Sequence, residues 1–219
     1  MTGGLRVLPC GERAVLLELD GLDAVLGLHA ALEADRPEGV EELVPAARTL
    51  LVAFDPARTG AERLSEALRA VRFQPGAPVT GELVEVPVTY DGEDLEEVAS
   101  LAEMSAEEVV RRHRDGEYVA AFCGFAPGFA YLDGLDEALH VPRRDSPRTR
   151  VPAGAVALAD RFTAVYPRAS PGGWRLIGRT ELGLWDVSRD PPAVLVPGTR
   201  VRFTDAAGDT VTRRQAGAG

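Results

Sequence analysis

The sequence predicts an α+β chain of two domains, a small α/β domain over residues 1–80 and a β-barrel domain over residues 81–213. Three observations support this prediction. Strand-like and helix-like periods alternate in the first third of the chain, the turn-forming residues 74–78 then interrupt all periodicity, and short apolar runs separated by Gly and Pro dominate from Gly124 onward. The small, polar residues 214–219 are expected to form a frayed tail.

Within the first domain, residues 13–19 alternate between apolar and polar, which predicts a strand, and residues 22–32 place apolar side chains at helical spacing. Residues 49–54 form a short apolar run that predicts another strand. Thr59 and Glu62 have the spacing of a capping box, so a second helix is expected to begin there. This order indicates an open α/β sandwich whose helices cover one face of an antiparallel or mixed sheet.

The second domain begins with residues 84–90, whose alternation predicts a strand and whose Pro87 places that strand at a sheet edge. Two acidic helical stretches follow, and Ser105 with Glu108 form a second predicted capping box. The remaining strand candidates are short and separated by turn residues: 118–122, 151–158, 162–166, 174–177, 182–187, 193–196 and 200–203. Such spacing is typical of a β-barrel or a β-sandwich.

The charged residues exclude several functions. A net charge of −10 argues against nucleic acid or an anionic membrane as the main partner. All 24 basic residues are arginine, so the chain has no lysine for a Schiff base, a P-loop or biotin attachment. Residues 1–110 carry a net charge of −14 and residues 111–219 a net charge of +4. Either the second half attracts an anionic small ligand, or the first half simply presents a solvated acidic face.

The cysteines, histidines and apolar runs constrain location and cofactors. Cys10 and Cys123 lie far apart, and no segment has the pattern of a signal peptide or a membrane span, so a reduced cytoplasmic protein is expected. His29, His113 and His140 are scattered and no zinc-ligand spacing occurs, so no metal site is expected.

Two segments carry aromatic and basic candidate residues. Residues 124–132 (GFAPGFAYL) hold Phe125 and further aromatics on a backbone constrained by Gly and Pro, which predicts either a pocket wall or rings that fill the barrel core. Residues 142–154 contain four arginines within eight positions. This density favours a carboxylate or phosphate site with Arg148 pointing inward, or else a solvated arginine-rich loop.

A third segment, residues 166–180 (YPRASPGGWRLIGRT), begins at Tyr166. Ser170, Gly172 and Gly173 could form a nest of backbone N–H groups that binds an anion, with Arg179 one strand away, or they could form a plain hairpin turn. Because the segment lacks a G-x-S-x-G elbow, its serine is expected to form hydrogen bonds and not to attack a substrate.

His113 has two interpretations. Its ordinary pKa suits proton transfer, which would make it a general acid or base. Alternatively it is a structural residue at the end of a helix, where the macrodipole favours a cation.

Together these segments resemble the family that includes the B subunit of 5-oxoprolinase, allophanate hydrolase subunit one and the sporulation-kinase inhibitor KipI. The resemblance covers essentially the whole chain and is carried by residues 124–132, 147–154 (PRTRVPAG), 166–180 and 197–203 (PGTRVRF). It implies a small N-terminal α/β domain, expected to be ferredoxin-like, followed by a cyclophilin-like β-barrel. It also implies similarity to part of the carboxyltransferase region of urea carboxylase.

The resemblance further implies a function. The chain would be one component, inactive or nearly so alone, of an ATP-dependent enzyme that opens 5-oxo-L-proline to L-glutamate. Its partners would be the A subunit of that 5-oxoprolinase and a paralogous barrel protein, the C subunit. ATP would be shared with or bound by a partner subunit. The implied site comprises catalytic His113, Tyr166 and Ser170 and substrate-binding Phe125, Arg148, Gly172, Gly173 and Arg179.

Other functions stay open at this point. Residues 159–164 (ADRFTA) depart from the Gly-rich stretch of many oxoprolinase members and are similar to members associated with urea carboxylase, so an allophanate or urea derivative is the alternative substrate. A KipI-like inhibitor that docks on a sensor histidine kinase is a further alternative. A peptidyl-prolyl isomerase is supported by barrel analogy alone.

Overall fold

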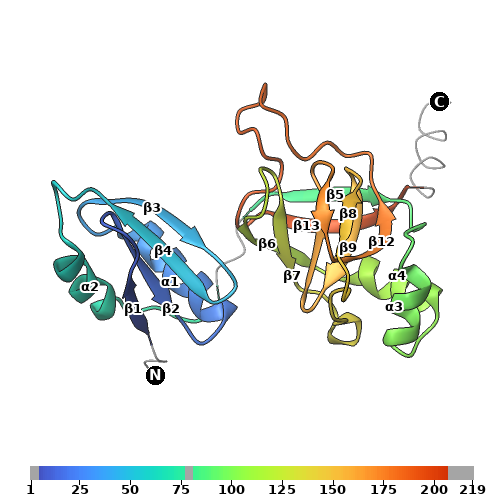
Figure 1. The fold of residues 1–219 in the computed structure, drawn as a ribbon, viewed down its shortest axis with the longest axis horizontal. Helices are drawn as coiled ribbons and strands as arrows, with labels where there is room; N and C mark the ends of the chain where they lie inside the picture. Colours follow the sequence, from blue (N-terminus) through green and yellow to red (C-terminus); the bar gives the residue numbers. More distant parts are fainter. Residues whose placement is uncertain (1–4, 77–80, 207–219) are drawn as a thin grey trace, which may run out of the picture. The chain divides into compact units, whose positions relative to one another are not determined.

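The computed structural model describes residues 5–76 and 81–206 and divides the chain into two compact units, Met1–Pro78 and Val79–Gly219 (Figure 1). Each unit has a hydrophobic core of its own. The turn predicted at residues 74–78 lies partly outside the described residues, and the tail predicted at residues 214–219 lies entirely outside them. Within the described ranges, no helix combines the length and the apolar character needed to cross a membrane.

The N-terminal unit is a four-stranded antiparallel sheet with two helices. Its elements are β1 (Arg6–Pro9), β2 (Ala14–Glu18), α1 (Leu22–Ala34), β3 (Val40–Pro45), β4 (Thr49–Phe54) and α2 (Ala61–Ala70). The strand order is β1-β2-β4-β3, so α1 carries the chain across β4 from β2 to β3.

The predicted small α/β unit is therefore observed, but its ferredoxin-like assignment is not confirmed. The ferredoxin-like fold follows the order β-α-β-β-α-β. Here the order is β-β-α-β-β-α, because a pair of strands, β1 and β2, precedes the first helix.

Both helices cover the same face of this sheet, as the sequence predicts. Side chains alternate along a strand, and on the covered face Leu17 of β2 and Leu50 of β4 are fully buried. They belong to one core with Leu28 of α1 and Leu64 of α2.

The capping box predicted at Thr59 and Glu62 is wrong. Helix α2 begins at Ala61 with Gly60 as its N-cap, and no side chain caps it. Thr59 is buried against the turn that precedes β3, where a Cβ added to Gly39 would lie 2.8 Å from Thr59 Cγ2. Packing against this turn takes the place of the expected cap.

The C-terminal unit contains a nearly closed seven-stranded barrel with helices beside it (Figure 1). Its elements are β5 (Leu83–Val88), α3 (Leu95–Leu101), α4 (Ala106–Asp115), β6 (Tyr118–Cys123), β7 (Ala130–Asp133), the 3-10 helix η1 (Glu137–Leu139), β8 (Arg148–Val151), β9 (Ala155–Ala159), β10 (Phe162–Val165), β11 (Ser170–Gly172), β12 (Arg175–Arg179) and β13 (Arg200–Asp205).

The barrel order is β12-β9-β10-β7-β6-β13-β5, in which only the β13–β5 pair is parallel among the described strands. Its two ends meet at one bridge, where Thr89 and Arg179 exchange backbone hydrogen bonds of 2.8 and 2.9 Å. Pro87 lies in the terminal strand β5, which confirms its predicted edge position.

Two predicted strand regions differ from the structure. Residues 151–158 divide between β8 and β9 at Gly154, whose φ of +79° interrupts an extended strand. Strand β8 then leaves the barrel and pairs with β11 in a two-stranded ladder. Residues 182–187 and 193–196 form no named strand and share a single bridge, because consecutive prolines between them cannot donate ladder hydrogen bonds.

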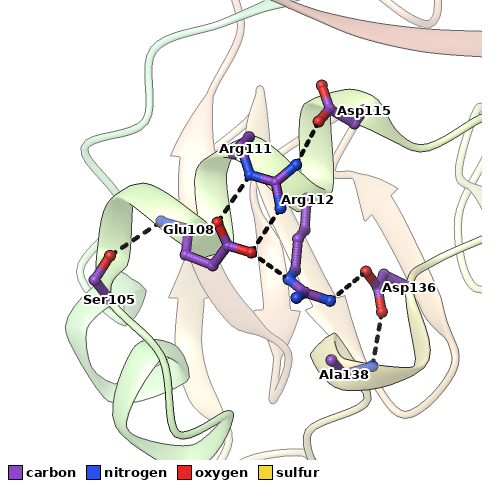
Figure 2. Close-up of polar contacts among 7 residues, drawn as sticks. All are labelled: Ser105, Glu108, Arg111, Arg112, Asp115, Asp136 and Ala138. Atoms are coloured by element: carbon purple, nitrogen blue, oxygen red, sulfur yellow. Dashed lines mark hydrogen bonds and ion pairs between the residues drawn. The ribbon is translucent and has the colours of Figure 1, made fainter.

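Helix α4 begins at the predicted cap, although only half of the capping box forms (Figure 2). Ser105 Oγ accepts a hydrogen bond from the Glu108 N–H at 3.2 Å. The Glu108 carboxylate accepts instead from Arg111 at 2.6 and 2.8 Å and from Arg112 at 2.7 Å, since charged donors are the stronger partners. Arg112 also donates to Asp136 at 2.9 Å, which connects α4 to the start of η1 (Figure 2).

We expect Ser105→Ala to lower the free energy of unfolding of the C-terminal unit by about 1 kcal/mol, because an N–H in the first turn loses its acceptor. Both tryptophans of the chain, Trp174 and Trp185, lie in this unit, so their fluorescence reports its unfolding in urea. Ser65→Ala on α2, in the other unit, is the control and should leave this transition unchanged. Equal transitions for Ser105→Ala and the wild type would show that the cap does not contribute.

Candidate functional site

The aromatic residues of the 124–132 segment form a second core on the outer face of the barrel wall. Along β7, Leu132 belongs to the barrel core, so the alternating neighbour Tyr131 points outward. Phe129, Tyr166 and Trp174 pack with it, and the ring centroid of Phe129 lies 5.2 to 5.6 Å from those of the other three. The rings of this segment therefore do not fill the barrel core, which was one of the two alternatives that the sequence left open.

Phe125 is the exposed ring of this cluster. Its side chain is 59% exposed, and its ring packs edge to face on Phe129 and Tyr166 at 5.2 and 6.3 Å. Its φ of +65° is uncommon for a residue with a bulky side chain. A strained backbone that holds an apolar ring in solvent favours a role in binding.

Tyr166, which contacts this ring, also lies against Gly172, and Gly172 pairs with Arg148. Gly172 of β11 pairs with Arg148 of β8, and a Cβ added to Gly172 would collide with Tyr166 Oη. Only glycine lets the strand approach the phenol this closely. Burial raises the pKa of Tyr166, so its hydroxyl stays protonated.

The anion-binding nest predicted at Ser170, Gly172 and Gly173 is not formed. Residues 170–172 are a strand, and neither glycine has the left-handed φ that a nest requires. Ser170 Oγ donates to the Arg168 carbonyl at 3.4 Å, and the Gly173 carbonyl accepts from the Arg144 N–H at 2.8 Å. Pairing with β8 keeps residues 170–172 extended, so their backbone N–H groups cannot converge on one anion.

Arg148 is held by a buried carboxylate that the sequence did not identify. Asp94, 2% exposed at the start of α3, accepts from Arg148 Nη2 at 2.7 Å and from Arg144 Nη1 at 2.8 Å through one oxygen. Its other oxygen accepts from the Leu176 N–H of β12 at 2.7 Å. Burial alone would raise the pKa of Asp94, but these hydrogen bonds and the adjacent guanidinium charges outweigh it and lower the pKa.

Two further carboxylates complete this cluster of charges. Glu93, whose side chain is 74% exposed, reaches Arg148 at 3.2 Å, and Glu97 lies 2.6 Å from Arg175 Nη1. Arg148 Nη1 and Arg144 Nε are buried without a hydrogen-bond partner among the described residues. The arginines Arg144, Arg148 and Arg175 therefore lie in one cluster, and this cluster is largely neutralised by carboxylates of the same chain.

His113 lies inside the barrel and not at this surface. It is fully buried, with its ring 4.3 Å from that of Phe203. Thr163 Oγ1 donates to the Ala157 carbonyl at 3.0 Å, so it accepts from His113 Nε2 at 2.9 Å, and the Tyr90 hydroxyl donates to Nδ1 at 2.9 Å. Burial lowers the pKa of His113 to about 3. This placement does not fit the predicted catalytic role, because the single N–H of the neutral ring is donated to Thr163 inside the barrel and the other nitrogen accepts from Tyr90.

Arg179 lies apart from the cluster. It occupies the end of β12 opposite Arg175, and four strand residues span about 13 Å. Its guanidinium pairs with Asp91 at 2.9 Å and Glu181 at 3.3 Å and borders a hollow of about 200 Å³ beside the barrel seam. The structure thus groups Phe125, Tyr166, Arg148, Ser170, Gly172 and Gly173 and separates them from His113 and Arg179.

Asp94 was missed because it belongs to an acidic stretch, residues 91–97, in which nothing in the sequence distinguishes a buried carboxylate from its exposed neighbours. The density of arginines at residues 143–150 was the available signal, since buried guanidinium groups need carboxylate partners. Within the described ranges, no group of three or more His, Cys, Asp or Glu is arranged to hold a metal ion.

Comparisons with known proteins agree with this architecture. The chain is 38% identical over 201 residues to the B subunit of 5-oxoprolinase from Escherichia coli O157:H7, covering 88% of this chain and 92% of that protein. It is 48% identical over 128 residues to the B subunit of 5-oxoprolinase from Bacillus subtilis (strain 168), covering 57% of this chain and 53%, about half, of that protein.

A solved structure, that of TTHA0988, superposes with a TM-score of 0.74 at 40% sequence identity, covering 89% of this chain and 40% of that one. This likeness fits the expected cyclophilin-like barrel. The carboxyltransferase domain, subdomain C and D, matches residues 5–195. The chain therefore belongs to the carboxyltransferase domain family, subdomain C and D.

Proposed function

We propose that this chain is the B subunit of an ATP-dependent 5-oxoprolinase, which opens 5-oxo-L-proline to L-glutamate in the cytoplasm. It would act together with a paralogous barrel protein, the C subunit, and with the A subunit. The observation that carries the proposal is the 38% identity that extends over 92% of the E. coli relative. The free cysteines Cys10 and Cys123 are compatible with a reducing compartment.

The described residues of the candidate site do not fit a triphosphate. The chain has no lysine, and the Ser170–Gly172 segment is an extended strand that does not converge its N–H groups on an anion. Arg144 and Arg148 are paired with the buried carboxylate of Asp94. We therefore assign ATP binding to one of the partners, and we give this chain a role in holding the amide substrate.

Arg148 is the arginine we assign to the substrate carboxylate. Its partner Asp94 is buried and fixed, but its second partner Glu93 is exposed and can swing into solvent. A substrate carboxylate could replace Glu93 and form a charge-assisted hydrogen bond with a guanidinium that Asp94 keeps oriented. Tyr166 and Phe125 would then provide the apolar surface against the lactam ring.

An allophanate or urea derivative is the second candidate substrate, favoured by the resemblance noted for residues 159–164 and by 21% identity over 238 residues to a urea amidolyase from Saccharomyces cerevisiae. Reconstitution distinguishes the two. The chain is combined with the A and C subunits from its own organism, and ATP hydrolysis and glutamate release are measured with 5-oxoproline, allophanate or urea. We expect turnover with 5-oxoproline that requires this chain. Activity confined to the urea derivatives, or full activity without this chain, would contradict the proposal.

In the same assay, we expect Arg148→Gln to lower kcat/KM for 5-oxoproline by roughly 10- to 100-fold, because a hydrogen bond to a charged group is lost. Arg144→Gln is the matched control, since Arg144 donates to the same Asp94 oxygen. A comparable loss in both variants would show that the effect comes from the charge cluster and not from contact with the substrate.

A further inference from the structure

One surface of the C-terminal unit exposes large apolar side chains next to the candidate site. Phe125 is 59% exposed, Trp185 39% and Val187 82%. A Cβ added to Gly128 would lie 2.8 Å from Trp185 Cβ and 3.4 Å from Pro167 Cβ, so the turn that carries Phe125 is packed directly on Trp185. We call Phe125, Pro167 and Trp185 the aromatic rim.

The aromatic rim is held rigidly on both sides. Phe125 rests on the buried Phe129 and Tyr166. Trp185 is bridged to Ala193, and the neighbouring Asp186 N–H donates to the Pro192 carbonyl at 3.0 Å. Aromatic side chains that are already ordered lose little conformational entropy when a partner covers them.

Two exposed arginines near the candidate site have unneutralised charges, and one of them, Arg168, directly follows Pro167 of the aromatic rim. Arg150 on β8 and Arg168 before β11 adjoin the paired positions Val151 and Ser170, and both are exposed. Neither forms an ion pair with any residue in the described ranges, in contrast to Arg148, which is paired with Asp94. Residues 111–219 as a whole carry a net charge of +4.

The exposed apolar side chains and the unpaired arginines together indicate what kind of partner would bind this surface. Exposed aromatic side chains with arginines are the composition of protein–protein hot spots, and unneutralised guanidinium groups need carboxylates from the other side. We propose that the aromatic rim, with Arg150 and Arg168, docks an acidic patch around an apolar recess on the C subunit of the enzyme. The inference rests on the proposed function and extends it, because a partner seated on Phe125 covers the face above Tyr166 and completes the substrate site.

Binding of the purified chain to the purified C subunit from the same organism, measured by isothermal titration calorimetry, tests this surface. We expect Trp185→Ala to weaken binding by roughly 30-fold or more, as for a hot-spot residue. The double variant Arg150→Glu/Arg168→Glu should weaken it by at least about tenfold and should reduce its salt dependence, because two attractive charges become repulsive.

Matched controls have the same chemistry elsewhere. Arg48→Glu/Arg58→Glu changes the net charge equally at two exposed arginines of the N-terminal unit, and Leu101→Ala removes a side chain that is 46% exposed. Both should bind like the wild type. Unfolding curves of every variant establish that it is folded.

Each outcome decides the matter. Weak binding by the rim variants alone supports the docking surface. Wild-type binding by the rim variants overturns the docking surface and leaves the proposed function intact. A raised KM for 5-oxoproline with unchanged binding to the C subunit has the same consequence, because the arginines would then bind a small anion and not the partner. A wild-type chain that neither binds the C subunit nor supports turnover overturns the proposed function, and the docking surface with it.

Discussion

Asp94→Asn is expected to lower the free energy of unfolding of the C-terminal unit by about 3 kcal/mol, at the lower end of the range for breaking a buried ion pair. The variant keeps the size of the side chain and an oxygen for the Leu176 N–H, but it removes the charge that neutralises Arg144 and Arg148. Both guanidinium groups would then remain beside α3 with too few acceptors. The lower end applies because the Arg144 side chain is 31% exposed and can partly rehydrate.

The measurement is urea unfolding followed by the fluorescence of Trp174 and Trp185, which both lie in this unit. Asp91→Asn is the control, since its side chain is 48% exposed and pairs with the exposed Arg179. A surface pair of this kind contributes less than about 1 kcal/mol. Equal, small losses in both variants would show that the Asp94 cluster does not stabilise the unit.

The second large effect is a loss of stability in acid that depends on His113. Its pKa is about 3 in the folded chain, against 6.5 for the ordinary side chain. Between these values the unfolded state binds a proton that the folded state does not, so stability is complete above pH 6.5 and falls as the pH falls towards 3. Two pH units below 6.5, the loss is about 3 kcal/mol for this one group.

The variant His113→Gln tests the assignment. Glutamine can accept from Tyr90 and donate to Thr163 but cannot be protonated, so its stability should fall less steeply between pH 6.5 and about 4.5. Phe203→Leu is the control, because it loosens the packing around the ring without removing a titrating group. The free energy of unfolding of Phe203→Leu should be lower than that of the wild type at every pH but should change with pH in the same way. If His113→Gln also runs parallel, His113 does not cause the acid sensitivity.

Local patterns were sufficient to predict much of the fold. The alternation of residues 13–19 and 84–90, the cap at Ser105 and the edge position of Pro87 each depend on neighbours within a few residues, and the structure confirms them. The capping box at Thr59 failed because the same spacing was overridden by packing against a turn distant in sequence.

The candidate site was predicted only in part. The arginine-rich and aromatic segments were singled out by composition, and the structure does bring Phe125, Tyr166 and Arg148 together. Composition could not reveal that Asp94, more than fifty positions away from Arg148, neutralises it. Nor could it distinguish a histidine directed into the barrel from one at a surface.

The sequence alone determined the positions of most helices and strands, the absence of lysine and the family to which the chain belongs, because these follow from residue identity and short-range period. Tertiary structure decided which face of the barrel wall each motif occupies. A strand's side chains alternate between its two faces, so Thr163 meets His113 inside while its neighbour Phe162 joins the aromatic cluster outside. Strand pairing and bulges, which bring distant residues together, settle that choice.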